Sequence, residues 1–564
     1  MAQMTGSASL ESLLRPVARL ALPVIATNLL QTLVNVVDVF MAGRLGAVPV
    51  AAVGFASSVA LLVTLVAQMV TAGGMALAAQ ARGANDDDEL AEVARQTLLL
   101  GVLAALAIGA LGWFAAHPLL AFMNSSGDTG AVTLGVGYLR ILFLGTAALF
   151  LNLGLASLWQ GAGDTLTPLL LGGSVNLLNV LFDYLFMFGP GPLPALGVPG
   201  AGLGTVAAWA IGATLGLVLF LRGGTVLRRG RGPLRPDLRR FGTILTIGTP
   251  AGLQGLAYAL SRLLLLRVVT STPAGTLGAA ALAIGIQIES LAYMPGVALS
   301  VAATSLVGRA LGAWQVAQAW RRGHAALFVG LAVMSSVGLV LLVGAPLWIR
   351  LFDPSGNAVV VRAGISYLRI NALAQPVLAV FMVLSGALRG AGDTRPALWG
   401  TFTGRWLVTL PVAWLLALRT PLGVDGAWWA MAAGTLVQAA WVARRWFAGA
   451  WPDVALSRQL LFRLHLVALA REERERFLDA VRRPLLALAG SRELVDEAGA
   501  VYLVAGHGPV RIGFQPELRV LEGIDTLETV AGFDALTAGH APRSASSGAR
   551  SVERPYGSSE RPPP

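Results

Sequence analysis

Three carboxylic acids lie inside long apolar stretches of the sequence, and they are the residues best placed to do chemistry. They are Asp38, Asp183 and Glu289. An ionisable group within an apolar span of membrane length is costly, so such residues usually mark ion or substrate paths. Asn176, Asn179 and Asp183 follow one another at spacings that place them on one face of a helix.

A first polar cluster is expected around Asp38 and Asp183. Asp38, in the segment Asn35-Val-Val-Asp38, lies near one end of its span, and Asp183 and Thr205 fall at a similar depth. Two carboxylates that share an apolar site cannot both ionise easily, so the pair is suited to carrying a proton. The same oxygens can instead coordinate Na⁺, and a cluster that only fixes helix packing is the structural alternative. The candidate cation-coupling residues are Asp38, Asp183, Asn179, Thr205, Asn176 and Asn35.

The second half of the chain offers a different set of charges. Glu289 lies in the middle of an apolar span, and Arg262 and Arg267 occupy the span before it. An ion pair that stabilises this half is one interpretation, and a contact to a cationic substrate is the other.

The elements that position these residues are predicted to be membrane-spanning helices. The chain of 564 residues is 55% hydrophobic and 13% charged, and its apolar residues come in runs long enough to cross a bilayer. About twelve spans are expected, which makes the fold an all-α polytopic membrane protein. They cover residues 20–42, 47–72, 93–116, 134–158, 167–188, 200–221, 243–270, 276–303, 324–349, 365–387, 396–418 and 424–446.

The two halves of this region repeat each other. Gly161-Ala-Gly-Asp-Thr165 recurs as Gly390-Ala-Gly-Asp-Thr394, and Tyr138-Leu-Arg140 recurs as Tyr367-Leu-Arg369, both at 390 − 161 = 367 − 138 = 229 residues. Six spans in each half give parallel repeats, with a cleft expected between two lobes. The repeated segments are interpreted as structural: the first as a turn and helix cap, the second as packing or an interfacial anchor.

The acids of the first half are not repeated in the second. Adding 229 to 38 and 183 gives Arg267 and Val412, so acid chemistry is predicted in the first half only. The predicted divisions are an N-terminal lobe (1–221), a linker (222–242), a C-terminal lobe (243–449), an extension (450–537) and a disordered tail (538–564).

The basic residues predict the orientation in the membrane. Arginines gather at the N-terminus, in the 73–92 loop, in the 222–240 connection, in the 304–323 loop and after the last span. By the positive-inside rule this side is cytoplasmic, so we expect a multi-pass protein of the cell membrane with both termini in the cytoplasm. The net charge of +11 is then topogenic and does not indicate a nucleic-acid partner.

The composition argues against an enzyme. The chain has no cysteine and no lysine, which excludes thiolate sites, a Walker-type phosphate loop and Schiff-base chemistry. The histidines have no ligand spacing, so apart from a coupling H⁺ or Na⁺ no cofactor or metal is expected. They are His117, His324, His465, His507 and His540. The expected partners are small organic substrates and the lipid bilayer, and the protein is expected to be a monomer.

The chain beyond residue 450 differs in composition from the spans. A charged helix is expected over 457–482, and short strands are expected at Val501–Val504 and Val510–Phe514. From about residue 538 the chain is rich in Ser, Pro, Gly and Arg, which predicts disorder.

Taken in order, these motifs resemble the multidrug and toxic compound extrusion (MATE) family over residues 10–450. The resemblance rests on two six-span halves, Asp38 followed by Met41-Ala-Gly-Arg-Leu-Gly46, the repeated Gly-Ala-Gly-Asp-Thr segment and Asn179-x-x-x-Asp183. The acid pair is similar to that of its DinF-like prokaryotic branch. The resemblance implies H⁺- or Na⁺-coupled export of amphiphilic, often cationic compounds, with residues matching Asp38, Asn179, Asp183 and Thr205 as the coupling site.

Two other functions remain open on the sequence alone. A lipid or lipid-linked saccharide flippase would share the fold, although such proteins usually have more spans and a more cationic cavity. Alternatively, the extension makes the protein a sensor or scaffold that its membrane part only anchors. Other MATE branches place acids in the seventh and tenth spans, and this sequence has none there.

Overall fold

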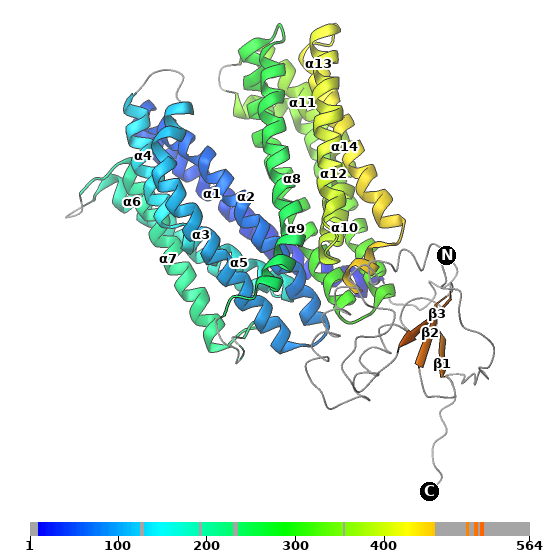
Figure 1. Cartoon of the computed structure of the whole chain (residues 1–564). Helices are drawn as coiled ribbons and strands as arrows, with labels where there is room; N and C mark the ends of the chain where they lie inside the picture. Colours follow the sequence, from blue (N-terminus) through cyan, green and yellow to red (C-terminus); the bar gives the residue numbers. More distant parts are fainter. Residues whose placement is uncertain are drawn as a thin grey trace. The chain divides into compact units, whose positions relative to one another are not determined.

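The computed structural model describes residues 10–123, 129–190, 194–228, 230, 235–353, 356–456, 492–495, 501–505 and 508–512. The chain divides into two compact units, Met1–Pro452 and Asp453–Pro564. The first unit is the helical membrane region. Its helices form two bundles (Figure 1), which we call the first and second lobes, and residues 223–237 connect them.

The first lobe contains the helices that carry the acid pair. They are α1 (Leu10–Leu45), α2 (Ala47–Gly83), α3 (Asp87–Met123), α4 (Thr129–Leu144), α5 (Thr146–Ala162), α6 (Leu166–Phe188) and α7 (Val198–Arg222). A bend of 52° separates α4 from α5. It occurs at Gly145, where a Cβ atom would lie 2.4 Å from the side chain of Val206, so close packing against α7 favours glycine there.

The second lobe repeats this order with one irregular span. Its helices are α8 (Leu238–Thr270), α9 (Gly275–Gly312), α10 (Val316–Phe352), α11 (Ala358–Gly390), α12 (Arg395–Phe402), α13 (Leu410–Arg419) and α14 (Val424–Phe447). A π-helical segment, η1 (Thr403–Thr409), joins α12 to α13 and makes one continuous span of Arg395–Arg419. π-Helical turns are rare and occur frequently at functional sites.

The expected spans correspond closely to these helices. Ten helical segments of the described chain are long and apolar enough to cross a membrane, and the bent α4–α5 pair makes eleven. The twelfth expected span forms α14, which is long enough but carries Asp425, Gln438, Arg444 and Arg445 and so has a less apolar composition. The all-α polytopic class is confirmed.

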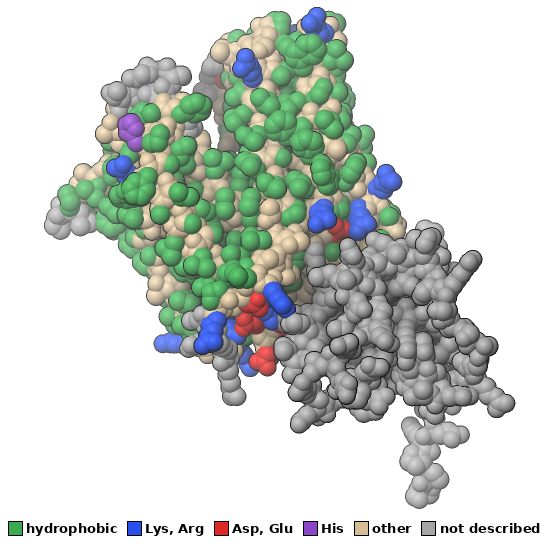
Figure 2. All heavy atoms as spheres, viewed as in Figure 1, with side chains coloured by type: hydrophobic (Ala, Val, Ile, Leu, Met, Phe, Trp, Pro, Cys, Tyr) green, Lys and Arg blue, Asp and Glu red, His purple; other side chains and the backbone are tan. Residues whose placement is uncertain are grey.

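The two lobes contact each other at one end and separate toward the other (Figure 1). We call the contacting end the arginine-rich end, because the last turns of α2, α7, α9 and α14 carry Arg82, Arg222, Arg309, Arg444 and Arg445 there. Figure 2 shows that charged residues gather at this end. Toward the opposite end, the two lobes are separate and their surfaces are mostly apolar.

Glycines allow the close contact between the lobes. A Cβ atom on Gly73 would lie 2.1 Å from the carbonyl oxygen of Ile244, and one on Gly83 would lie 2.0 Å from that of Arg309. Near the opposite end of α1 and α2, added Cβ atoms on Gly43 and Gly54 would meet nothing within 4 Å. Small residues therefore let the lobes pack closely at the arginine-rich end, and at the opposite end the lobes are apart (Figure 2).

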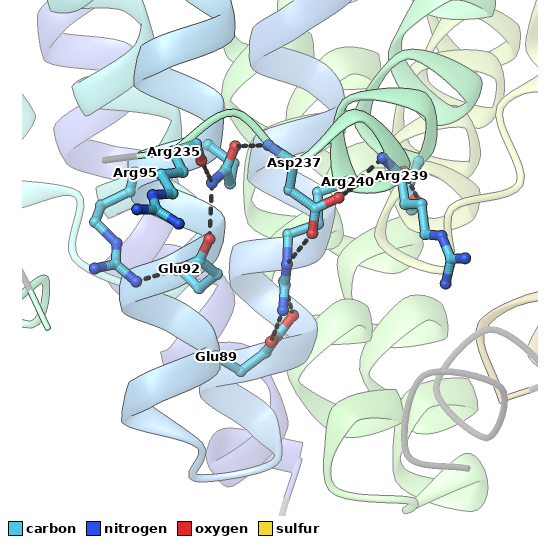
Figure 3. Close-up of polar contacts among 9 residues, drawn as sticks. Glu89, Glu92, Arg95, Arg235, Asp237, Arg239 and Arg240 are labelled. Carbon is cyan, nitrogen blue, oxygen red and sulfur yellow. Dashed lines mark hydrogen bonds and ion pairs between the residues drawn. The ribbon is translucent and has the colours of Figure 1, made fainter. Parts of the chain in front are cut away.

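Polar side chains add a second closure at the arginine-rich end, between α3 and the start of α8 (Figure 3). Arg240 donates two hydrogen bonds to the carboxylate of Glu89, at 2.7 and 2.9 Å. Gln96 donates to the carbonyl of Arg235 at 2.8 Å and accepts from the backbone of Asp237 at 3.0 Å. Asp237 also caps α8. We call Glu89, Gln96, Asp237 and Arg240 the α3–α8 latch.

In the second unit the structure describes a small antiparallel sheet of order β1-β2-β3. Its strands are β1 (Arg492–Val495), β2 (Val501–Ala505) and β3 (Gly508–Ile512). The strand predicted at Val501–Val504 is confirmed as part of β2, the one predicted at Val510–Phe514 overlaps β3 over residues 510–512, and β1 was not predicted. The helix expected over 457–482 and the tail over 538–564 lie outside the described residues.

Candidate functional site

The structure brings Asp38 of α1 and Asp183 of α6 together inside the first lobe. Their carboxyl groups lie within hydrogen-bonding reach of each other. Oδ1 of each acid is buried and has no donor among the residues that the structure describes. Two buried carboxylate oxygens repel each other unless a proton or a cation lies between them. Two ionised carboxyl groups at this distance would therefore destabilise each other.

The amide of Asn179 orients this pair from one turn away on α6. Its Nδ2 donates to Oδ2 of Asp183 at 3.1 Å and to Oγ1 of Thr205 at 3.1 Å. Thr205, on α7, in turn donates to the carbonyl of Ala201 at 3.0 Å. Asn179 thus presents N–H groups to the acid, and the hydroxyl of Thr205 is already used twice.

Gly204 makes the space in which the Asp183 carboxyl group lies. A Cβ atom at this position would be 2.1 Å from Oδ1 of Asp183. Asp183 is only 1% exposed, so the carboxyl group has little room to move away. Sequence reasoning did not identify Gly204, because a glycine in a glycine-rich span gives no signal of its contact.

Tyr138 of α4 is a further member of the cluster that sequence reasoning assigned to packing. It is partly buried and lies close enough to both Asp38 and Asp183 to interact with them electrostatically. The signal available in the sequence was its repetition as Tyr367.

The remaining two candidates of the first lobe occupy different surroundings. Asn176 is buried on α6, on the face that carries Asn179. Asn35 is exposed, and its Oδ1 accepts a hydrogen bond from Gln31 at 3.2 Å, so its amide is engaged within α1.

In the second lobe, Tyr367 of α11 donates its hydroxyl to Glu289 of α9. Tyr367 is fully buried and packs edge-on against Trp428, with ring centroids 5.0 Å apart. A Cβ atom on Gly285 would lie 2.3 Å from the Tyr367 ring, so α9 and α11 approach closely here. The repeated tyrosine therefore donates to a carboxyl group in the second lobe and lies near two carboxyl groups in the first.

The arginines of the second lobe are placed differently from each other. Arg262 and Arg405 lie close enough to act electrostatically on Glu289, whose hydrogen-bond partner is Tyr367. Arg267 is exposed in the last turn of α8. Sequence reasoning missed Arg405, although an arginine inside an apolar span is the same signal that identified the acids.

The repeated Gly-Ala-Gly-Asp-Thr segments are turns, as predicted. Gly163 and Gly392 have φ angles of +91° and +77°, which favour glycine. Asp164 accepts hydrogen bonds from the backbone of Leu166 and Thr167 at 3.1 and 3.0 Å and so caps α6. In the second lobe Asp393 pairs with Nε of Arg445 at 2.7 Å.

Comparison with known proteins shows the family. The MatE family profile matches residues 23–185 and 250–415, which lie in the first and second lobes respectively. The chain belongs to the MatE family. It is 34% identical to the multidrug resistance protein NorM of Burkholderia vietnamiensis over 433 residues, which are 74% of this chain and 90% of that protein. It is 28% identical to a probable multidrug resistance protein NorM of Thermotoga maritima over 448 residues, 78% of this chain and 93% of that one.

Solved MatE-type structures share the fold. One, described as the outward-facing conformation of a multidrug resistance MATE family transporter, superposes with a TM-score of 0.71 at 24% identity, over 78% of this chain and 99% of that one. Another, a Pyrococcus furiosus transporter described as having a binding pocket of reverse polarity, gives 0.72 at 24% identity with the same coverage. The predicted family is confirmed, and the DinF-like branch stays a prediction.

Proposed function

We propose that this MatE protein is a multidrug efflux transporter that exports organic compounds in exchange for a cation, by alternating access of its two lobes. The relatives over most of its length are named as multidrug resistance proteins. The observation that carries the proposal is the pair formed by Asp38 and the buried Asp183, each of which has a buried Oδ1 with no donor in the described chain. A pair of this kind inside a membrane protein suits reversible cation binding.

A proton fits the pair better than Na⁺. Sodium would take oxygen ligands. In the structure, Asn179 donates its N–H groups to Asp183 and Thr205. An N–H donor stabilises a carboxylate that shares a proton with its neighbour, whereas a sodium ion would require the amide to rotate. We therefore propose H⁺ as the coupling ion.

The separation of the lobes at one end and the arginines at the other support a direction of transport. With the arginine-rich end in the cytoplasm, as the positive-inside rule requires, the open end faces outward. Protons would then reach Asp38 and Asp183 from outside and change the packing of α1 against α6, which releases substrate outward. Opening the other end requires the α3–α8 latch to break. The substrates we propose are amphiphilic or cationic organic compounds.

The test is the loss of coupling when either acid is neutralised. Asp38→Asn and Asp183→Asn keep the shape of the side chain and remove its titratable group. Each is expected to reduce gradient-driven efflux of a fluorescent substrate to background, with unchanged amounts of protein in the membrane. Asp88→Asn, at an exposed position in the first turn of α3, is the matched control and should be fully active. Efflux persisting in both acid variants would exclude the coupling role.

A further inference from the structure

The interior of the second lobe carries more positive than negative charge. Tyr293 of α9 interacts electrostatically with Arg389, Arg405 and Glu289. Glu289 in turn interacts with Arg405 and Arg262. Two arginines, Arg262 and Arg405, therefore act on the Glu289 carboxyl group, and a third, Arg389, acts on the neighbouring Tyr293. We call Tyr258, Arg262, Tyr293, Arg389 and Arg405 the second-lobe basic pocket.

Arg405 is the most firmly placed of these cations. It lies in the π-helical segment η1, where α14 approaches so closely that a Cβ atom on Gly434 would be 2.5 Å from the carbonyl oxygen of Gly404. Its guanidinium group lies over the ring of Tyr258, 4.5 Å from the centroid. Arg405 is 9% exposed, and its Nε is buried with no acceptor among the described residues. The Nε of Arg389 is in the same situation.

The α8 members of the pocket, Tyr258 and Arg262, lie on the face of α8 that turns toward the first lobe. Gly248 and Gly255 of α8 contact α2 of the first lobe, where added Cβ atoms would lie 1.6 Å from the Met69 carbonyl and 2.6 Å from Leu65 respectively. Tyr258 and Arg262 follow on the same face at helical spacing, beyond the point where the lobes separate. Tyr258 and Tyr293 are each 40% exposed, so a molecule in the cleft can reach them.

We propose that the second-lobe basic pocket binds the acidic group of an anionic amphiphile, with Arg405 as its main contact. The planar guanidinium group matches a carboxylate, sulfonate or phosphate. A buried cation that lacks an acceptor is unfavourable, and ligand oxygens would supply the acceptors. The tyrosine rings give the apolar part of the ligand a surface. This inference rests on the proposed function and selects, among its substrates, amphiphiles with a negative charge.

The test compares two fluorescent probes that differ by one acidic group. 1-Anilinonaphthalene-8-sulfonate carries a sulfonate, and N-phenyl-1-naphthylamine has the same aromatic body without it. Binding to the purified full-length protein in phosphatidylcholine vesicles, corrected for empty vesicles, gives the affinity for each. Arg405→Gln is expected to weaken binding of the sulfonate probe about tenfold and that of the neutral probe less than about twofold.

Two further variants separate the role of charge from a loss of folding. Arg405→Lys keeps the charge but loses the planar fork, so it should bind the sulfonate probe with intermediate affinity. Arg419→Gln is the control, because Arg419 lies outside the pocket but also stacks on an aromatic ring. Its guanidinium group lies 5.1 Å from the centroid of the Trp414 ring. The Arg419→Gln variant should bind both probes like the wild type. Equal weakening of both probes in Arg405→Gln, or no preference of the wild type for the sulfonate probe, would overturn the proposal.

The binding assay needs no ion gradient, so its outcome is separate from that of the proposed function. If Asp38→Asn still drives efflux but the sulfonate preference depends on Arg405, the coupling proposal fails and the pocket proposal stands. Addition of phosphatidylglycerol to the vesicles identifies the source of the acid. If phosphatidylglycerol displaces the sulfonate probe, the pocket binds a lipid headgroup. If the probe stays bound in its presence, the pocket binds a small anionic amphiphile.

Discussion

Tyr138 and Tyr367 occupy equivalent places in the two lobes, 367 − 138 = 229 residues apart, but their surroundings have opposite charge. Tyr138 lies beside Asp38 and Asp183, which have amide and hydroxyl neighbours. Tyr367 donates a hydrogen bond to Glu289, and more arginines than carboxyl groups lie near this pair. The repeat thus supplies one helical arrangement, and each lobe uses it for different chemistry. We attribute ion coupling to the acidic lobe and substrate recognition to the basic lobe.

Among variants that leave every charge in place, the largest effect is expected from crowding the acid pair. Gly204→Ala places a methyl group where Oδ1 of Asp183 now lies, at 2.1 Å. Overpacking of this kind costs about 1–3 kcal/mol and should move Asp183 away from Asp38. Efflux, measured in cells against the amount of protein in the membrane, should fall about tenfold or more.

Gly54→Ala is the control for this variant. Gly54 lies in the same lobe, and its added Cβ atom would meet nothing within 4 Å. This variant should transport like the wild type. A fully active Gly204→Ala protein would show that the position of Asp183 does not matter for coupling, and the division of roles between the lobes would lose its basis.

A second effect distinguishes the two repeated tyrosines. Tyr367→Phe removes the hydroxyl that donates to the carboxyl group of Glu289. The free energy of unfolding should fall by about 1–3 kcal/mol, because a buried acceptor loses its donor. Thermal unfolding of the purified protein in detergent measures this change.

Tyr138→Phe is the matched variant of the acidic lobe. Because Tyr138 faces the proposed coupling acids, this variant should lower transport more than stability. Identical profiles of stability and transport in the two variants would contradict the idea that the repeat serves different chemistry in each lobe.

The smallest effect is expected at the α3–α8 latch, which joins both lobes. Glu89→Gln weakens a partly buried pair with Arg240, whose side chains are 22% and 18% exposed. A loss of about 1 kcal/mol should raise the population that is open at the arginine-rich end about fivefold. The chain has no cysteine, so Gly224→Cys, just after the end of α7, and Ala317→Cys, in the first turn of α10, introduce two unique sites for spin labels.

Distances between these labels in Glu89→Gln should therefore include a larger fraction of long separations. Asp87→Asn provides the comparison, since it removes an ion pair with Arg82 that lies within the first lobe. It should leave the distribution unchanged. If Glu89→Gln and Asp87→Asn shift the distance distribution equally, the effect comes from a general loss of charge and not from the latch.

Much of the fold could be predicted from the sequence, because span length and the 229-residue repeat depend on local composition. The order and direction of the spans predicted that four polar residues lie at a similar depth in the membrane, because each span enters from a known side. These residues are Asp38, Asn179, Asp183 and Thr205. Depth alone does not give the rotation of a helix. Asn35 precedes Asp38 by three residues, which is about 60° short of a full turn, and it points to an exposed surface.

The residues that sequence reasoning missed depend on contacts between helices. Gly204 matters only because α6 approaches α7 closely enough for Asp183 to fill the space. Arg405 lies in a π-helical turn that changes the rotation of the residues around it, and no local pattern predicts such a turn. Tyr138 became meaningful only when its repeat partner was found against a second acid.

The most direct test of the account is the ion movement that accompanies transport. Purified protein is reconstituted with a pH indicator inside the vesicles, and substrate is added with and without a sodium gradient. We predict a substrate-dependent proton flux that is independent of Na⁺ and absent in Asp38→Asn and Asp183→Asn. A flux that requires Na⁺, or one that persists in both variants, would contradict the assignment of proton coupling to the acid pair of the first lobe.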